Sequence, residues 1–356
     1  MDPITHALSG ALVGRATVPR VPDASRLTVQ ARIVTCAVAA AWPDVDIVVQ
    51  HLSPVAYLRH HRGLTHSILL WPLWAWLLAF AASRLARDPR GVRPWLSACA
   101  LGVALHIAGD LITSYGTLIL APLSDRRFAL GTTFIIDPWL SGIILAGLAG
   151  SLVMPRSRVP AVLATVVIVG YLGLQAVAKS HAHRLGKQHA REAKLDDARI
   201  DVHPRPVTPF NWTVFVSTSE RIDYAHVNTV RREPKPEPAP GAGFIARLNA
   251  PYRPLDQAQW QTRARFGDTP SERALVQAAW QAPALAVFRW FADVPAYDGM
   301  SPGVGCVWFR DLRFLTPGTD RSPFRYGVCR GAADRAWRLH LSEGGEALPV
   351  PVGAER

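Results

Sequence analysis

Residues 95–120, WLSACALGVALHIAGDLITSYGTLIL, form an apolar run in which His106 and Asp110 are the only histidine, acidic or basic side chains. A bilayer core needs about 20 apolar residues in a helix, so this run has the length of a transmembrane span. Residues four apart lie on one face of a helix, which places the imidazole beside the carboxylate. Ionisable groups inside a span are costly and indicate function, and the alternative is a His–Asp hydrogen bond that joins two helices.

The composition extends this interpretation to the whole chain. Of 356 residues, 49% are hydrophobic and 19% are charged, and the mean hydropathy is +0.11, whereas a soluble domain carries about 25% charged residues. Disordered, collagen-like and disulfide-scaffold classes are excluded. The net charge of +12 accompanies so much apolar sequence that anionic lipid headgroups suit it better than nucleic acid. We therefore expect the lipid bilayer as partner and expect no nucleic acid.

Four apolar runs predict four transmembrane helices, at residues 68–83, 95–120, 139–154 and 159–178. They are apolar all round rather than along one stripe, which favours lipid over the interior of a soluble bundle. Two shorter runs, residues 4–14 and 33–43, are too short to cross a bilayer alone and are expected to pack against the bundle as short helices.

The character of the chain changes after Ala178, where a strongly basic stretch begins that is expected to follow the lipid headgroups. Alternation at residues 212–216 and 222–226 predicts strands, and Thr269 followed by Pro270 predicts the start of a helix. The predicted fold class is thus mainly α, a polytopic membrane bundle followed by a small α+β domain. Its expected parts are a membrane domain at 1–178, a basic linker at 179–204 and a soluble domain at 205–356.

Further histidines and aspartates lie in short motifs ahead of the first predicted span. They occur as Asp2 with His6, as Asp44 and Asp46 in the motif PDVD, and as His60, His61 and His66 around Arg62. Imidazole nitrogens and carboxylate oxygens are the donors that zinc and harder first-row metals prefer. Each motif alone is also typical of a helix cap, a capped turn or an interfacial anchor. With the two short helices taken as non-crossing, however, the predicted topology brings all of these motifs to one side of the membrane.

The loop at residues 122–137 emerges on the same side and carries two arginines. Arg126 and Arg127 could each bind a phosphate or lie at lipid headgroups. We favour headgroups for Arg126, and both interpretations remain open for Arg127.

Six ordered motifs carry a family resemblance. They are MDxxTH at 1–6, PDxD at 43–46, HRGxTHS at 61–67, HxxxDxxxxYGT at 106–117, PxSxRR at 122–127 and IIDP at 135–138. Together they resemble the YdjM-like family of bacterial inner-membrane proteins, whose members are described as membrane-bound metal-dependent hydrolases. The resemblance covers residues 1–178 and implies a multi-pass protein of the bacterial inner membrane. It implies as metal ligands His6, His61, His66, His106 and Asp110, with Asp44 and Asp46 as further ligands or base, and it leaves His60 outside the pattern.

The chemistry of such a site agrees with hydrolysis. A metal ion held by imidazole and carboxylate with an open position lowers the pKa of a bound water to about 7. Seven candidate ligands exceed the four of a closed site, so one or two ions are expected, with zinc favoured and manganese or iron as alternatives. Arg62 or Arg127 would offset charge developing on the scissile group. The expected substrate is a lipid-like or anionic small molecule with an ester or phosphoester bond at the membrane surface.

Two other classes of function remain open. A metal or proton transporter would use His and Asp as an ion path, although the third and fourth predicted spans are nearly devoid of polar residues. A non-catalytic membrane scaffold would use the motifs only to hold helices together.

The orientation is also open. Lysine and arginine residues flank both sides of the predicted spans in equal number, and the basic run after residue 178 favours a cytoplasmic C-terminal domain. Cys306 and Cys329 fall on predicted strands and could pair as a disulfide or remain buried thiols.

Overall fold

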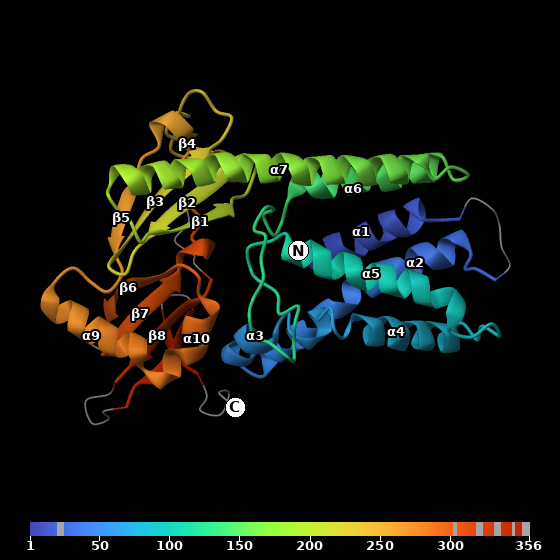
Figure 1. The fold of residues 1–356 in the computed structure, drawn as a ribbon, viewed down its shortest axis with the longest axis horizontal. Coiled ribbons are helices and arrows are strands. Elements are labelled where there is room, and N and C mark those ends of the chain that lie inside the picture. Colours follow the sequence, from blue (N-terminus) through green and yellow to red (C-terminus); the bar gives the residue numbers. More distant parts are fainter. Residues whose placement is uncertain (20–24, 302–304, 318–322, 331–335, 344–345, 351–356) are drawn as a thin grey trace. The chain divides into compact units, whose positions relative to one another are not determined.

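The computed structural model (Figure 1) describes residues 1–19, 25–301, 305–317, 323–330, 336–343 and 346–350. The chain divides into two compact units. The helical unit comprises Met1–Ile47 and His60–Val177, and the C-terminal unit comprises Val48–Arg59 and Ala178–Arg356.

Helices that run back and forth build the helical unit (Figure 1). They are α1 (Pro3–Ala16), α2 (Val29–Ala41), the 3₁₀ segments η1 (Trp42–His51) and η2 (Leu64–His66), α4 (Trp71–Leu85), α5 (Arg93–Leu111), α6 (Pro138–Val153) and the first part of α7 (Val159–Glu192). Proline occupies the first turn of α1, α4, α5 and α6, where a missing N–H costs nothing. Side chains of Asp2, Thr28 and Asp137 cap the starts of α1, α2 and α6 by accepting backbone N–H groups.

The helix α2 packs against both α1 and α5, and small residues make both contacts close. A Cβ atom at Gly10 of α1 would lie 2.4 Å from the Cys36 carbonyl oxygen, and one at Gly102 of α5 would lie 2.7 Å from the same oxygen. Both positions therefore require glycine. This close approach places the C-terminal ends of α2 and α5 beside each other.

Among the described residues, three helical segments are long and apolar enough to cross a membrane, namely Val29–His51, Arg93–Leu111 and Val159–Glu192. A fourth is possible if Pro54–His66 and Trp71–Leu85, bent by 76° at their junction, count as one span. The predicted membrane bundle is thus confirmed, while the predicted span count needs correction.

Two of the predicted segments differ from the structure for a physical reason. The run at 33–43 was expected to be too short to cross, but the helical backbone continues through η1 as far as His51. The run at 95–120 was expected to be one span, but α5 ends at Leu111 and the chain turns at Gly116, whose φ is +91°. The hydropathy of a segment indicates whether it faces lipid or water, but it does not indicate where a helix ends.

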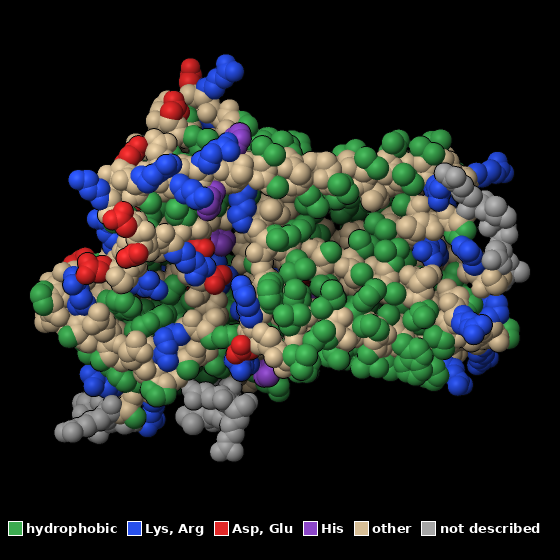
Figure 2. All heavy atoms as spheres, viewed as in Figure 1, with side chains coloured by type: hydrophobic (Ala, Val, Ile, Leu, Met, Phe, Trp, Pro, Cys, Tyr) green, Lys and Arg blue, Asp and Glu red, His purple; other side chains and the backbone are tan. Residues whose placement is uncertain are grey.

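Apolar side chains cover much of the face of the helical unit that Figure 2 shows. Leu145 of α6 is 51% exposed, and Val166 and Val169 of α7 are 62% and 66% exposed. Contiguous apolar surface on this scale is unfavourable in water and is expected where lipid is the solvent.

The C-terminal unit is built on two five-stranded sheets. The first contains β1 (Arg199–Pro204), β2 (Asn211–Ser217), β3 (Arg221–Asn228), β4 (Arg253–Pro254) and β5 (Gln261–Ala264). The second contains β6 (Pro295–Ser301), β7 (Cys306–Asp311), β8 (Arg325–Cys329), β9 (Arg338–Glu343) and β10 (Glu346–Pro349). The helices are α3 (Pro54–His60, of which His60 belongs to the helical unit), the last part of α7, α8 (Phe244–Asn249), α9 (Pro270–Gln281) and α10 (Ala286–Phe291).

Side chains alternate between the two faces of the first sheet. Trp212 and Val214 pack with Ala182 of α7 on one face, and Phe215 and Tyr224 pack on the other with residues next to the second sheet. The expected helix start is confirmed, because the Thr269 side chain accepts the Glu272 N–H at the start of α9.

Candidate metal centre

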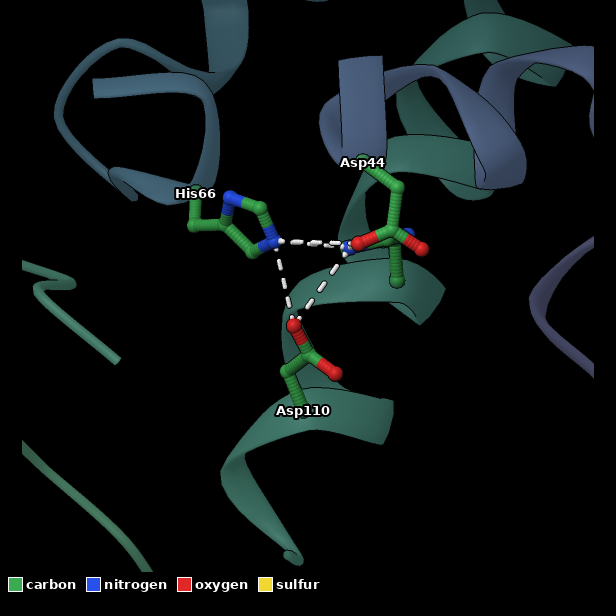
Figure 3. A group of neighbouring side chains, drawn as sticks. Asp44, His66 and Asp110 are labelled. Atoms are coloured by element: carbon green, nitrogen blue, oxygen red, sulfur yellow. Dashed lines mark hydrogen bonds and ion pairs between the residues drawn. The ribbon is translucent and has the colours of Figure 1, made fainter. Parts of the chain in front are cut away.

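Four side chains meet inside the helical unit, and three of them are labelled in Figure 3. One ligand atom from each of Asp44, His66, His106 and Asp110 lies within 4.8 Å of the others, and all four residues are buried. His66 Nε2 lies 3.0 Å from Asp110 Oδ2 and 2.9 Å from His106 Nε2. Two imidazoles and two carboxylates are a donor set that suits zinc and other first-row metals.

The other ring nitrogen of each histidine fixes its tautomer. His106 Nδ1 lies 2.6 Å from the Ala40 carbonyl oxygen, which can only accept, so Nδ1 carries the proton. Thr65 Oγ1 donates to Asp46 Oδ2 at 2.7 Å and lies 2.9 Å from His66 Nδ1. Since its proton is used, Thr65 accepts from His66 Nδ1. Both Nε2 atoms therefore present lone pairs to the cluster.

Two lone pairs that face each other at 2.9 Å repel unless a cation or a proton lies between them. Two further atoms of the cluster, Asp44 Oδ2 and Asp110 Oδ2, are buried without a hydrogen-bond partner. Buried polar atoms without partners are uncommon in native structures and call for a missing ion or ligand. The residues present thus fit a metal cation.

Asp110 is held from its other side. Its Oδ1 atom lies 3.1 Å from His6 Nε2 and 3.0 Å from Arg62 Nη2, and it also contacts the amino group of Met1. The His6 ring stacks on the His106 ring at 3.7 Å between centroids. His6 therefore contacts Asp110 and His106 without joining the four-residue cluster.

Asp46 and His61 form a neighbouring pair, with His61 Nδ1 2.7 Å from Asp46 Oδ1. Asp46 Oδ2 lies 3.3 Å from His66 Nδ1 and accepts the Arg62 backbone N–H at 3.0 Å. Hence Asp46 orients His66, and His61 lies behind Asp46. His60, which the family pattern leaves out, is exposed.

Both arginines expected to offset charge at the scissile group, Arg62 and Arg127, contact the same aromatic ring. The guanidinium carbons of Arg62 and Arg127 are each 4.8 Å from the Tyr115 ring centroid. Arg62 is 2% exposed, donates to Thr113 Oγ1 at 2.9 Å and pairs with Asp110. Arg127 donates to the carbonyl oxygens of Tyr115 and Gly116. Arg62 thus contacts the cluster directly, whereas Arg127 shapes the loop beside it.

All four cluster residues lie at one end of the helices α2, α4 and α5. His106 and Asp110 occupy the last two turns of α5, Asp44 follows α2, and His66 precedes α4. The Ala40 carbonyl and Thr65 were not foreseen from the sequence. A backbone carbonyl leaves no sequence signal, whereas Thr65 stands within the HRGLTHS motif.

Apolar helices of spanning length and a buried cluster of metal-type ligands define the class of protein. It is a multi-pass membrane protein with a candidate metal centre in its N-terminal half.

The chain belongs to the YdjM inner membrane protein family, whose model matches residues 1–182. Together with the apolar helices, this membership gives a location in the bacterial inner membrane. The chain is also 27% identical over 247 residues to the uncharacterized protein YfhP of Bacillus subtilis strain 168, an alignment that covers 67% of this chain and 74% of that protein. No solved structure matches.

Proposed function

We propose that this protein is a membrane-bound metal-dependent hydrolase that cleaves an ester or phosphoester bond in a lipid-like or anionic substrate. One observation carries the proposal. The Nε2 atoms of His66 and His106 lie 2.9 Å apart, both unprotonated, beside two buried carboxylates. The residues that would bind the metal ion are Asp44, His66, His106 and Asp110, and zinc is the favoured ion. When bound, such an ion activates water and polarises the scissile group.

Residues around the cluster orient its ligands and offset charge. The Ala40 carbonyl and the Asp46–Thr65 pair aim the two imidazoles, because each holds the Nδ1–H of one ring. His6 and Arg62 hold Asp110 through Oδ1 and leave Oδ2 for the cluster. Arg62 offsets part of the negative charge of Asp110 and of any anionic substrate group beside it.

Asp44 is the candidate general base. It is 8% exposed, while the other three cluster residues are fully buried, so it lies nearest to the solvent. Its Oδ2 atom has no hydrogen-bond partner among the residues that the structure describes. In the proposed step, water oxygen bonds to the carbonyl carbon or phosphorus and its proton passes to Asp44 Oδ2. The bond to the leaving alkoxide oxygen then breaks, and the same proton passes from Asp44 Oδ2 to that oxygen, which releases the alcohol and restores the carboxylate.

The substrate class rests on location. The cluster lies within helices whose outer surface is apolar, so an amphiphilic molecule reaches it from the bilayer surface more readily than a fully water-soluble one. A transporter is less well supported, because the apolar part of α7, residues 159–178, contains no Asp, Glu, His, Lys or Arg.

The test combines metal analysis and turnover. Full-length protein is purified in detergent, its metal is quantified by mass spectrometry, and ester and phosphoester lipids are screened as substrates. We expect stoichiometric metal in the wild type and in His60→Ala, and loss of both metal and turnover in His106→Ala. His60→Ala is the matched control because His60 is exposed and lies in the same histidine motif.

Two outcomes would count against the proposal. A wild type that contains no transition metal and resembles His106→Ala in every respect would favour the scaffold. A metal-loaded protein that turns over no ester or phosphoester would instead favour metal binding without hydrolysis.

A further inference from the structure

Two cysteines of the second sheet are joined in the structure. Cys306 on β7 and Cys329 on β8 stand opposite each other in the antiparallel register and form a disulfide. Both are buried beside Trp308, at 1% and 6% exposure. Disulfides persist in oxidising compartments and are rare in the cytosol. The C-terminal unit thus carries a chemical mark of an extracytoplasmic location.

The helical unit has an independent mark of its orientation, since three of its connections meet at one end. Arg15 at the end of α1 donates to the carbonyl oxygens of Pro155 and Ser157, in the turn between α6 and α7. Arg90, between α4 and α5, donates to the carbonyl oxygen of Arg26, between α1 and α2. These hydrogen bonds place the α1–α2, α4–α5 and α6–α7 connections together, and we call this the arginine end.

The arginine end is strongly basic, and Figure 2 shows Lys and Arg side chains gathered there. Among the described residues, its acidic side chain is Asp88, and its basic ones are Arg15, Arg26, Arg32, Arg84, Arg87, Arg90, Arg93, Arg156 and Arg158. At the opposite end, the short connections at residues 42–70 and 112–137 carry as many aspartates as arginines. Basic residues in short connections mark the cytoplasmic side of a membrane.

The direction of α7 relates the basic arginine end to the disulfide-bonded C-terminal unit. The helix starts at the arginine end, directly after the α6–α7 turn, and the chain therefore leaves the membrane at the opposite side. The basic run at residues 179–194 follows this exit, but it belongs to a long C-terminal segment, and long segments cross the membrane largely regardless of charge. The charge pattern of the short connections and the disulfide thus agree on one orientation.

We propose that the arginine end is cytoplasmic and that the metal centre and the disulfide-bonded C-terminal unit lie on the extracytoplasmic side. Asp44, His66, His106 and Asp110 all lie at helix ends opposite the arginine end, so a ligand of the centre enters from outside the cytoplasm. This orientation holds whether or not the protein is a hydrolase. If the proposed function also holds, this orientation implies that the substrate enters the site from the outer half of the bilayer, and this last step rests on the proposed function.

The test labels cysteines placed at the two ends of the helical unit. Pro89→Cys lies in the α4–α5 connection, and Leu123→Cys lies in the loop after α5 at a position that is 82% exposed. Intact bacterial cells are treated with a membrane-impermeant maleimide, with the wild type as blank and permeabilised cells as the control in which both variants label. We expect Leu123→Cys to label in intact cells and Pro89→Cys to label only after permeabilisation.

A second arm tests the disulfide in the same full-length protein. Cells are quenched in acid, the chain is denatured, and thiols are alkylated with and without prior reduction. We expect only Cys36 and Cys99 to react without reductant, and Cys306 and Cys329 to react in addition after reduction, with the double variant Cys306→Ser/Cys329→Ser as the reference. The opposite labelling of Pro89→Cys and Leu123→Cys, or free Cys306 and Cys329 thiols without reductant, would overturn the proposal. Neither arm depends on hydrolytic activity.

Discussion

The carboxylate of Asp46 contacts several residues of the motif HRGLTHS at residues 61–67. It contacts His61 Nδ1 and Thr65 Oγ1 at 2.7 Å each and the Arg62 backbone N–H at 3.0 Å, and it lies 3.3 Å from His66 Nδ1. Carboxylates that orient a metal-ligating imidazole are worth about 10–100-fold in metal affinity.

We therefore expect Asp46→Asn to bind metal about 10–100-fold more weakly than the wild type while the fold is retained. A competition titration with a chromophoric chelator measures this. Asp125→Asn, an exposed change on the loop after α5, serves as the control and should leave the affinity unchanged. Equal affinity in all three proteins would show that Asp46 does not orient His66.

Two histidines of the C-terminal unit, the buried His203 and the partly buried His226, predict a pH dependence of its stability. Burial, with help from Arg205, lowers the pKa of His226 to about 3. Burial, with help from Arg313, lowers the pKa of His203 well below 6.5. Below pH 6.5 the unfolded chain therefore binds protons that the folded chain does not, and stability falls as the pH falls, by about 1.4 kcal/mol per pH unit for each histidine.

Hydrogen exchange of β2 and β3 peptides in the full-length protein measures this effect. Protection should be constant above pH 6.5 and should decline steadily from there towards pH 3, the range set by the pKa of His226. His226→Gln should weaken the decline, whereas His340→Gln on β9 should not. The idea fails if His226→Gln and the wild type lose protection in parallel.

At the scale of elements, the contact between α2 and α5 sets the geometry of the metal centre. It brings the Ala40 carbonyl of α2 within 2.6 Å of His106 on α5. The contact depends on Gly102, because a Cβ atom there would lie 2.6 Å from Ala39 Cβ and 2.7 Å from the Cys36 carbonyl oxygen.

Gly102→Ala should push the two helices apart and cost about 1–3 kcal/mol of stability. We also expect it to lower the metal content, since His106 moves away from Ala40. Gly170→Ala on α7 is the matched control, because among the described residues no atom outside the adjoining stretch of its own helix lies within 4 Å of the added methyl, and alanine should be neutral or favourable in that helix. Thermal unfolding and metal analysis of both variants in detergent check this, and identical behaviour would show that the contact tolerates a methyl group.

Element type was predictable here and element length was not. Apolar runs identified the helices α4, α5, α6 and α7, because composition reports the solvent that a segment faces. The helical backbone continues from α2 into η1 without a sequence signal for its end, and the end of α5 at Leu111 is accompanied by backbone hydrogen bonds to distant residues. An example is the bond from the Leu130 N–H to the Leu111 carbonyl oxygen.

At the scale of the whole molecule, the cluster residues come from segments distant in the sequence. A cation held by Asp44, His66, His106 and Asp110 would therefore cross-link η1, η2 and α5. A ligand that binds only the folded state stabilises it by about 2.7 kcal/mol at a concentration 100 times its Kd.

Removal of metal by a chelator should thus raise hydrogen exchange around residues 40–46, 64–67 and 104–112 of the full-length protein. The disulfide-bonded strands β7 and β8 should not respond and provide the internal control. Re-addition of zinc should restore protection. A uniform response of both units would indicate global unfolding instead of a metal bound at this cluster.

Composition and motifs were enough to indicate that this chain lies in lipid and which side chains are its candidate metal ligands. Long apolar runs require lipid, and histidines and aspartates beside or within such runs are too costly to be incidental. The ordered motifs likewise pointed to the family that the comparison then showed.

Only the tertiary structure decided which of the candidate ligands face one another. Asp44, His66, His106 and Asp110 converge, while His6, His61 and Asp46 stand one contact further away. Which ligands converge depends on the distance between the helices and on their rotation. Close glycine contacts such as that of Gly102 set this distance, and the order of residues along the chain does not reveal it. The strand register likewise joined Cys306 to Cys329, because pairing across a sheet is fixed by backbone hydrogen bonds and not by spacing along the chain.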